Sequence, residues 1–326
     1  MRNRKIISFI TVLLSTIIIQ TGCSHQELYY VHTGEITINF HWSASRVNTS
    51  KSTRDIEEIT VYLFPEDGSS PLRFVLTGYR GGIIEDVPLG HYKVIAYNSD
   101  TEVLLPIGGM TYESFGLRAN TTSLLSPMGI KSDDGVPRIR GMEDEPITWG
   151  VDPVWAGRVK SISLTAGETD IRVNVDMEEC FSSISITVNN IGNLQNATAY
   201  SATVDGMAYS YFPGTDEVSP RSTIIPFAIT AGDDNSITGN FLTFGHSADE
   251  GHTHNLVLYF ILLDGTKVYY SFDITEAMHE ATAMSTGEIS LEFDEFCLPD
   301  VMNDPEGKGL ALDILPWEHK EIPIHL

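Results

Sequence analysis

The stretch Gly34-Glu35-Ile36-Thr37-Ile38-Asn39-Phe40-His41-Trp42 alternates between polar and apolar side chains from residue 35 onward. Successive side chains of a β-strand point to opposite faces, so the four apolar residues of this stretch would share one face. The opposite face would carry Glu35, Thr37, Asn39 and His41. This period of two predicts a half-buried strand and indicates a β fold at the start of the globular part of the chain.

Strand patterns of this kind continue along most of the sequence. We expect further strands at 59–64, 72–76, 91–98, 159–164 and 171–175, and then at 183–189, 198–204, 224–229, 239–245, 255–263, 267–274 and 288–293. Turn-forming residues separate them, and no long segment repeats apolar residues at helical spacing. The one helical hint, at 112–117, is weak. The fold class is therefore all-β, built as sandwiches or barrels.

The length of 326 residues predicts more than one domain. We place an N-terminal β-sandwich domain at 34–179 and a C-terminal β-sandwich domain at 180–326, with the boundary at 178–181 after an acidic turn. The first domain contains a long insert, 101–153, rich in Gly, Pro, Ser, Asp and Met. Long irregular excursions of this kind are usually functional or mobile.

The N-terminus has the features of an export signal. Arg2, Arg4 and Lys5 precede an apolar run at 6–19 that is too short to cross a bilayer, and Thr21-Gly22-Cys23 follows. A small residue directly before a cysteine is typical of bacterial lipoproteins, although Gln20 stands where an aliphatic residue is commoner. We predict a signal peptide at 1–22, lipidation of Cys23 and a tether at 23–33. The alternative is an ordinary signal peptide cut nearby, with Cys23 free.

The net charge limits the partners. Loss of residues 1–22 would remove three of the 20 basic residues and none of the 44 acidic ones, so the formal charge would change from −24 to −27. A surface this acidic repels nucleic acid, whose binding depends on neutralising phosphates. No nucleophile elbow, phosphate-binding glycine loop or dinucleotide fingerprint occurs in the sequence. We therefore expect no enzyme, no cofactor and no nucleic-acid partner.

Two clusters offer candidate metal ligands. His246, His252 and His254 are the best set, because histidines at i and i+2 of an extended segment point to one side. No carboxylate partner is evident, however, and we expect a solvated loop without metal. The acidic residues at 133–134 and 143–145 lack the spacing of a calcium loop and are expected to be solvated too.

The remaining cysteines, Cys180 and Cys297, could pair in an exported protein or stay as buried thiols.

Aromatic residues are the candidate ligand platform. Trp149 and Trp155 lie beside prolines in the insert, where they could stack on sugar rings or close a loop over the core. Trp42 lies on the apolar face of its strand, which favours the core.

Five segments taken in order carry a family resemblance: 59–65, 87–98, 152–156, 205–208 and 241–245. Together they resemble the lipoproteins of Bacteroidales that group with fimbrillin-like proteins, the subunits and anchors of type V pili. The resemblance implies two tandem transthyretin-like β-sandwich domains and an outer-membrane, surface-exposed lipoprotein. It also implies a fimbrial subunit, anchor or adhesin whose partners are other fimbrillin-like subunits or surface ligands.

The same resemblance implies assembly by strand exchange. A protease removes the N-terminal strand after an arginine, and a strand of the next subunit fills the open groove. Arg46 and Arg54 are the matching positions here, although anchor subunits keep their lipid and are not cut. The alternating segment 321–326 could donate a strand, with Pro323 suited to an edge. The alternative functions are a surface glycan-binding lipoprotein and, less favoured, a hydrolase.

Overall fold

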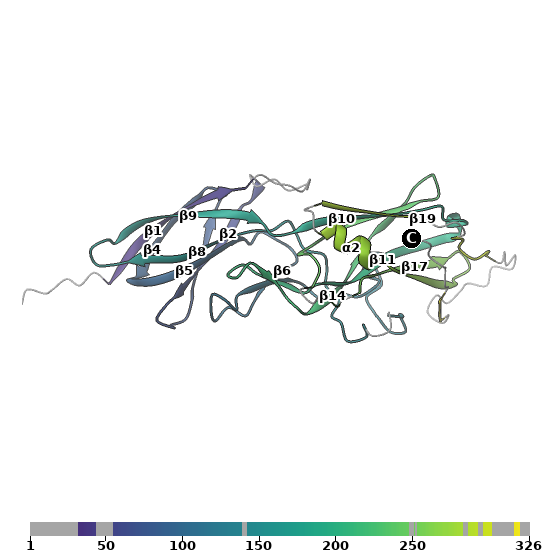
Figure 1. Ribbon diagram of the computed structural model, residues 1–326, viewed down its shortest axis with the longest axis horizontal. Coiled ribbons are helices and arrows are strands. Elements are labelled where there is room, and N and C mark those ends of the chain that lie inside the picture. Colours follow the sequence, from purple (N-terminus) through teal and green to yellow (C-terminus); the bar gives the residue numbers. More distant parts are fainter. Residues whose placement is uncertain are drawn as a thin grey trace, which may run out of the picture. The chain divides into compact units, whose positions relative to one another are not determined.

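The computed structural model describes residues 32–43, 55–138, 142–247, 251, 253–282, 286–292, 296–301 and 316–319 (Figure 1). Within these ranges nearly all regular structure is strand, which confirms the all-β prediction. No helix in the described part of the chain is long and apolar enough to span a membrane. The expected signal peptide lies outside these residues, as do Cys23, Arg46, Arg54, His252 and the segment 321–326.

A seven-stranded sheet forms the N-terminal lobe, with the order β3-β2-β5-β8-β9-β1-β4. Its strands are β1 (Thr33–Trp42), β2 (Glu58–Pro65), β3 (Leu72–Thr77), β4 (Gly81–Pro88), β5 (Gly90–Asn98), β8 (Trp155–Leu164) and β9 (Asp170–Glu179). Strands β3 and β4 stand at opposite ends of this order, yet only residues 78–80 join them. The sheet must therefore curve round on itself, and it encloses one hydrophobic core.

Two sheets form the C-terminal lobe, in the orders β15-β16-β10-β19 and β14-β11-β17-β18-β20. The strands are β10 (Ser182–Asn189), β11 (Ala197–Ala208), β14 (Ser222–Phe227), β15 (Ile229–Ala231), β16 (Ile237–Thr243), β17 (Asn255–Leu262), β18 (Lys267–Asp273), β19 (Thr286–Glu292) and β20 (Trp317–His319). A second core lies in this lobe and includes residues such as Ile184 and Phe260. Two residues, Cys180 and Phe181, connect β9 to β10. The division into two domains at 178–181 remains a prediction.

The insert is more ordered than its composition suggested. It contains β6 (Leu104–Ile107), β7 (Gly116–Ala119) and the 3-10 helix η2 (Ser126–Met128). Strand β7 pairs with β12 (Ser210–Phe212), which pairs with β13 (Glu217–Val218), so one small sheet combines the insert with a segment from the second half of the chain. The weak prediction of a helix at 112–117 is wrong, because these residues form a turn that is followed by the start of β7.

Two further helical segments belong to the C-terminal half. The 3-10 helix η3 (Leu194–Asn196) precedes β11, and helix α2 (Thr275–Thr282) connects β18 to β19. Helix α2 contacts both β19 and β10. The sequence analysis missed this helix because its eight residues are too few to show a helical period.

Trp155 lies in the N-terminal core, with none of its surface exposed. Its ring meets the rings of Trp42 and Phe181 edge-on, with centroids 6.2 and 5.6 Å away. Its backbone N–H donates to the buried side-chain oxygen of Asn98 at 2.7 Å. The Trp155 ring therefore has no exposed face on which a sugar could stack, so its placement among the candidate sugar-binding residues is wrong. Its burial favours the alternative, in which this tryptophan closes the loop over the core. Trp149 is half-buried.

We expect Trp155→Ala to lower the free energy of unfolding by about 3–5 kcal/mol, the usual cost of removing a fully buried aromatic ring. Trp149→Ala is the matched control and should cost much less, because its ring is partly exposed. Urea unfolding followed by circular dichroism measures both. Equal effects of the two substitutions would contradict this account of the core.

Candidate functional site

Strand β1 occupies a slot between two strands that are distant from it in sequence. It runs parallel to β9 along Glu35–Trp42 and antiparallel to β4 along Thr33–Asn39. Ile36 and Ile38 have no exposed surface, and Phe40 has almost none. Burial of three such side chains stabilises the lobe by about 1.5–3 kcal/mol each. A strand from another chain could enter this slot only after β1 had left it.

The C-terminal end of β1 is fixed by a polar contact. The indole Nε1 of Trp42 donates a hydrogen bond to the backbone oxygen of Tyr79 at 2.6 Å. Ser43 continues the pairing through its N–H, which donates to the oxygen of Met177 at 3.0 Å. The strand is therefore held along its whole length.

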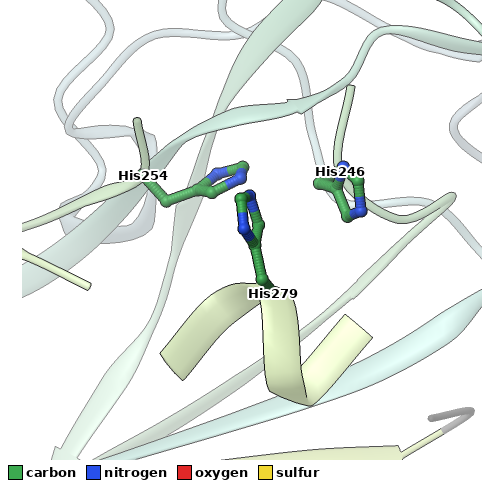
Figure 2. A group of neighbouring side chains, drawn as sticks. All are labelled: His246, His254 and His279. Atoms are coloured by element: carbon green, nitrogen blue, oxygen red, sulfur yellow. The ribbon is translucent and has the colours of Figure 1, made fainter. Parts of the chain in front are cut away.

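A second feature of the chain is a group of three histidines in the C-terminal lobe. His246, His254 and His279 each offer a ring nitrogen, and these three nitrogens lie within 4.8 Å of one another. The ring centroids are 5.1 to 6.0 Å apart. Figure 2 shows the rings of His254 and His279 close together, with His246 beside them. His246 and His254 were candidate ligands from the sequence, and His279 was not.

His254 directly precedes β17 and is completely buried, so the expectation of a solvated loop is wrong at this position. Its backbone N–H donates to Thr275 Oγ1 at 2.9 Å, and its backbone oxygen accepts from the N–H of Ile274 at 2.8 Å. Its Nδ1 lies 3.0 Å from the backbone oxygen of Asp205. A carbonyl only accepts, so this contact places the ring proton on Nδ1 and the lone pair on Nε2.

A bulge in β11 makes room for the His254 ring. The pairing of β11 with β14 shifts register between Val204 and Met207, and Gly206 has a φ of +72°. A Cβ at Gly206 would lie 2.6 Å from His254 Nδ1, so only glycine fits beside the ring. The bulge therefore positions the histidine.

His246 follows β16 and is fixed on the same bulge. It forms an isolated bridge with Met207, and the N–H of Ser247 donates to the oxygen of Gly206 at 3.0 Å. Its Nδ1 lies 2.8 Å from the backbone oxygen of Ser247, which again places the lone pair on Nε2. The side chain is half-buried.

His279 is an exposed residue in the last turn of α2. Asp273 caps the start of this helix, because its Oδ1 accepts from the N–H of Thr275 at 3.0 Å. Asp273 followed three residues later by Glu276 is the signal that could have revealed the helix from the sequence. Nothing in the sequence indicated that α2 would bring His279 to the other two histidines.

Two buried acidic side chains lie behind the histidines. Burial raises the pKa of Asp205 to about 7; hydrogen bonds from Asn255 oppose this increase, and the nearby Glu145 adds to it. Burial also raises the pKa of Glu145. The expectation of solvated acids is therefore wrong for Glu145. Asp133 is half-buried, and its Oδ1 accepts a hydrogen bond from the N–H of Leu124 at 2.7 Å.

The raised pKa of Asp205 predicts a pH dependence of stability. A carboxyl whose pKa is about 7 in the folded protein and near 3.8 in the unfolded chain favours folding at low pH. That contribution is lost as the pH rises through about 7. We expect Asp205→Asn to flatten the decrease in the free energy of unfolding between pH 5 and 8, measured in urea.

Asp170→Asn, at the exposed start of β9, is the matched control for this experiment and should leave the decrease unchanged. If the free energy of unfolding of the Asp205→Asn variant decreased between pH 5 and 8 as much as that of the wild type, Asp205 would not be the group responsible.

The other predicted site residues are dispersed. Cys180 and Cys297 are both free thiols, so the pairing considered from the sequence does not occur. Burial raises the pKa of the Cys180 thiol to about 12. Cys23, Arg46, Arg54 and His252 lie outside the described residues, so their roles remain predictions.

Comparisons with known proteins identify a matching family and similar proteins. The profile of a family described as "Domain of unknown function (DUF5119)" matches residues 22–228. A curated protein of Bacteroides ovatus, "Putative fimbrium anchoring subunit Fim4B", is 25% identical over 348 residues, with 96% of this chain and 97% of that protein covered.

Solved structures share the fold. One is a crystal structure from Bacteroides ovatus that is titled a "putative adhesin". It matches this chain with a TM-score of 0.64 at 21% sequence identity, and the match covers 86% of this chain and 98% of the adhesin chain. The fimbrial anchor protein Mfa2 from Porphyromonas gingivalis has a TM-score of 0.50 at 16% sequence identity, and the match covers 79% of this chain and 90% of Mfa2. The comparisons together confirm the resemblance seen in the sequence.

Proposed function

This chain belongs to the DUF5119 family, and we propose that it is an outer-membrane lipoprotein that anchors a fimbrium to the cell surface. The observation that carries the proposal is the similarity to the fimbrium anchoring subunit named above, which extends over 96% of the chain. Similarity over nearly the full length of both proteins supports a shared role for the whole molecule. The domain arrangement proposed from the sequence, two β-sandwiches after a lipidated tether, suits that role.

The structure of β1 shows what an anchor would have to retain. An anchor must keep its N-terminal strand, because the lipid at Cys23 and the folded lobe are connected through it. Strand β1 is paired on both sides and buries its apolar face, so it completes its own lobe. Strand exchange into this slot would first require cleavage after β1, at Arg46 or Arg54, and we propose that this cleavage does not occur.

A partner subunit would then have to bind elsewhere. Among the residues that the structure describes, strand β20 stands at the edge of the C-terminal sheet and pairs in parallel with β18 over three residues, Trp317–His319. Edges of this kind accept strands from other chains by β-augmentation. We propose that the fimbrial subunit binds along this edge.

We expect Cys23→Ser to abolish membrane anchoring, because one thioether-linked diacylglyceryl group is the only attachment proposed. In the bacterium that encodes the chain, the variant should move from the outer-membrane fraction to the soluble fraction. Fimbriae should then be recovered from the medium instead of the cells. Retention of both the variant and the fimbriae on the outer membrane would contradict the proposed anchor.

We expect the mature protein on the cell surface to be uncut at Arg46 and Arg54. Mass spectrometry of the purified surface protein should find one N-terminus, the lipidated Cys23. The double variant Arg46→Lys and Arg54→Lys should assemble fimbriae at the wild-type level, since Arg-specific cleavage plays no part in anchoring. A mature N-terminus at residue 47 or 55 would instead assign the chain to the polymerising subunits.

A further inference from the structure

We propose that His246, His254 and His279 bind a divalent transition-metal ion, with Zn²⁺ as the ion that suits them best. The site is independent of fimbrial anchoring and of any residue used in that proposal. Its three ligands come from three separate segments: the loop after β16, the residue directly before β17 and helix α2 (Figure 2).

The geometry of the three rings suits a metal ion. In a tetrahedral site with Zn–N bonds of about 2.0–2.1 Å, ligand nitrogens are roughly 3.3 Å apart. The three nitrogens here lie within 4.8 Å of one another, so small side-chain rotations would bring them into range. His279 is exposed on α2 and has room to make most of that movement. On the solvent-exposed side of the three histidines, a water molecule would take the fourth coordination position of the ion.

The contacts behind the rings match those of known metal ligands. A metal-bound histidine usually donates its other ring N–H to a carbonyl or carboxylate, which fixes the ring and its tautomer. His254 makes this contact with Asp205 and His246 makes it with Ser247. In both cases the lone pair is on Nε2, as a metal ligand requires. Three neutral imidazoles are a donor set that suits Zn²⁺, Cu²⁺ or Ni²⁺.

The surroundings of the site also favour a cation. The whole chain has a formal charge of −24, which raises the local concentration of positive ions. Asp205 accepts hydrogen bonds from the backbone and side chain of Asn255, the residue after His254. This network fixes the start of β17, and with it the buried ligand. An ion here would connect α2 to the sheet that contains β11 and β17.

The test is Zn²⁺ binding to the mature chain from residue 23, with Cys23→Ser so that no lipid or thiol is present there. Isothermal titration should show one equivalent of Zn²⁺ bound per chain. His279→Ala and His246→Ala should each weaken binding by more than about 10-fold, because even the loss of a hydrogen-bond partner behind a metal ligand costs about 10–100-fold. His91→Ala, an exposed histidine on β5, is the matched control and should bind as the wild type does.

A spectroscopic readout separates this site from adventitious binding. Co²⁺ should give the visible absorption of a tetrahedral or five-coordinate nitrogen site in the wild type, and His279→Ala should remove it. Because His279 is exposed, that variant should fold, so its result remains decisive even if His254→Ala does not fold. The proposal is overturned if the wild type binds no Zn²⁺, or if binding and the Co²⁺ spectrum persist in both the His279→Ala and His246→Ala variants.

Discussion

The insertion of β1 between β9 and β4 is the interaction on which the N-terminal lobe depends. Parallel strands need a long connection, and here the connection from β1 to β9 includes every other strand of the lobe. Both neighbours of β1 use it for their backbone pairing, and its apolar face contributes to the core between them. Loss of this strand would leave two unpaired edges and an open apolar slot. The same strand lies next to the proposed lipid tether, so one segment determines both the fold of the lobe and its attachment.

The insert is the second structural constraint, because it connects elements from both halves of the sequence. Its strand β7 pairs with β12, and the backbone N–H of Val151 donates to the oxygen of Leu242 at 3.0 Å. The hydroxyl groups of Thr148 and Thr223 lie 3.0 Å apart in a buried contact. A third cluster of buried residues, separate from the two cores, joins Leu124 and Ile147 of the insert to Tyr259 of β17. A composition rich in Gly, Pro and Ser gave no sign of this packing.

Period-two alternation predicted the strands that have one buried and one exposed face. Strands β1 and β10 were recognised for this reason, whereas β14 and β17, which are buried on both faces, were predicted as short runs between turn-forming residues. Strand β4 was missed because its sequence, from Gly81 to Pro88, begins with two glycines and includes Asp86 at a φ of +56°. Strands β6 and β7 are four residues long, too short to show a period. Length and periodicity are local properties, so they could not reveal the pairing of β7 with β12.

The histidine group shows that local sequence properties are equally unable to reveal which residues of a site come together. His246 and His254 are close in sequence and were recognised as candidate ligands, but their burial depends on the bulge at Gly206 and on the packing of α2. His279 joins them through the tertiary fold alone. A sequence pattern can therefore supply ligand types, while the strand order decides which of them meet.

Hydrogen exchange of the β1 amides measures whether β1 belongs to the same cooperative unit as the rest of its lobe. Mass spectrometry of the mature chain reports on peptides from β1 and β9 in one experiment. The account predicts that the amides of residues 36–40 exchange as slowly as those of their partners in β9, because both strands belong to one cooperative unit. Rapid exchange of residues 36–40 beside a protected β9 would contradict it, since β1 would then leave its slot while the rest of the lobe stayed folded.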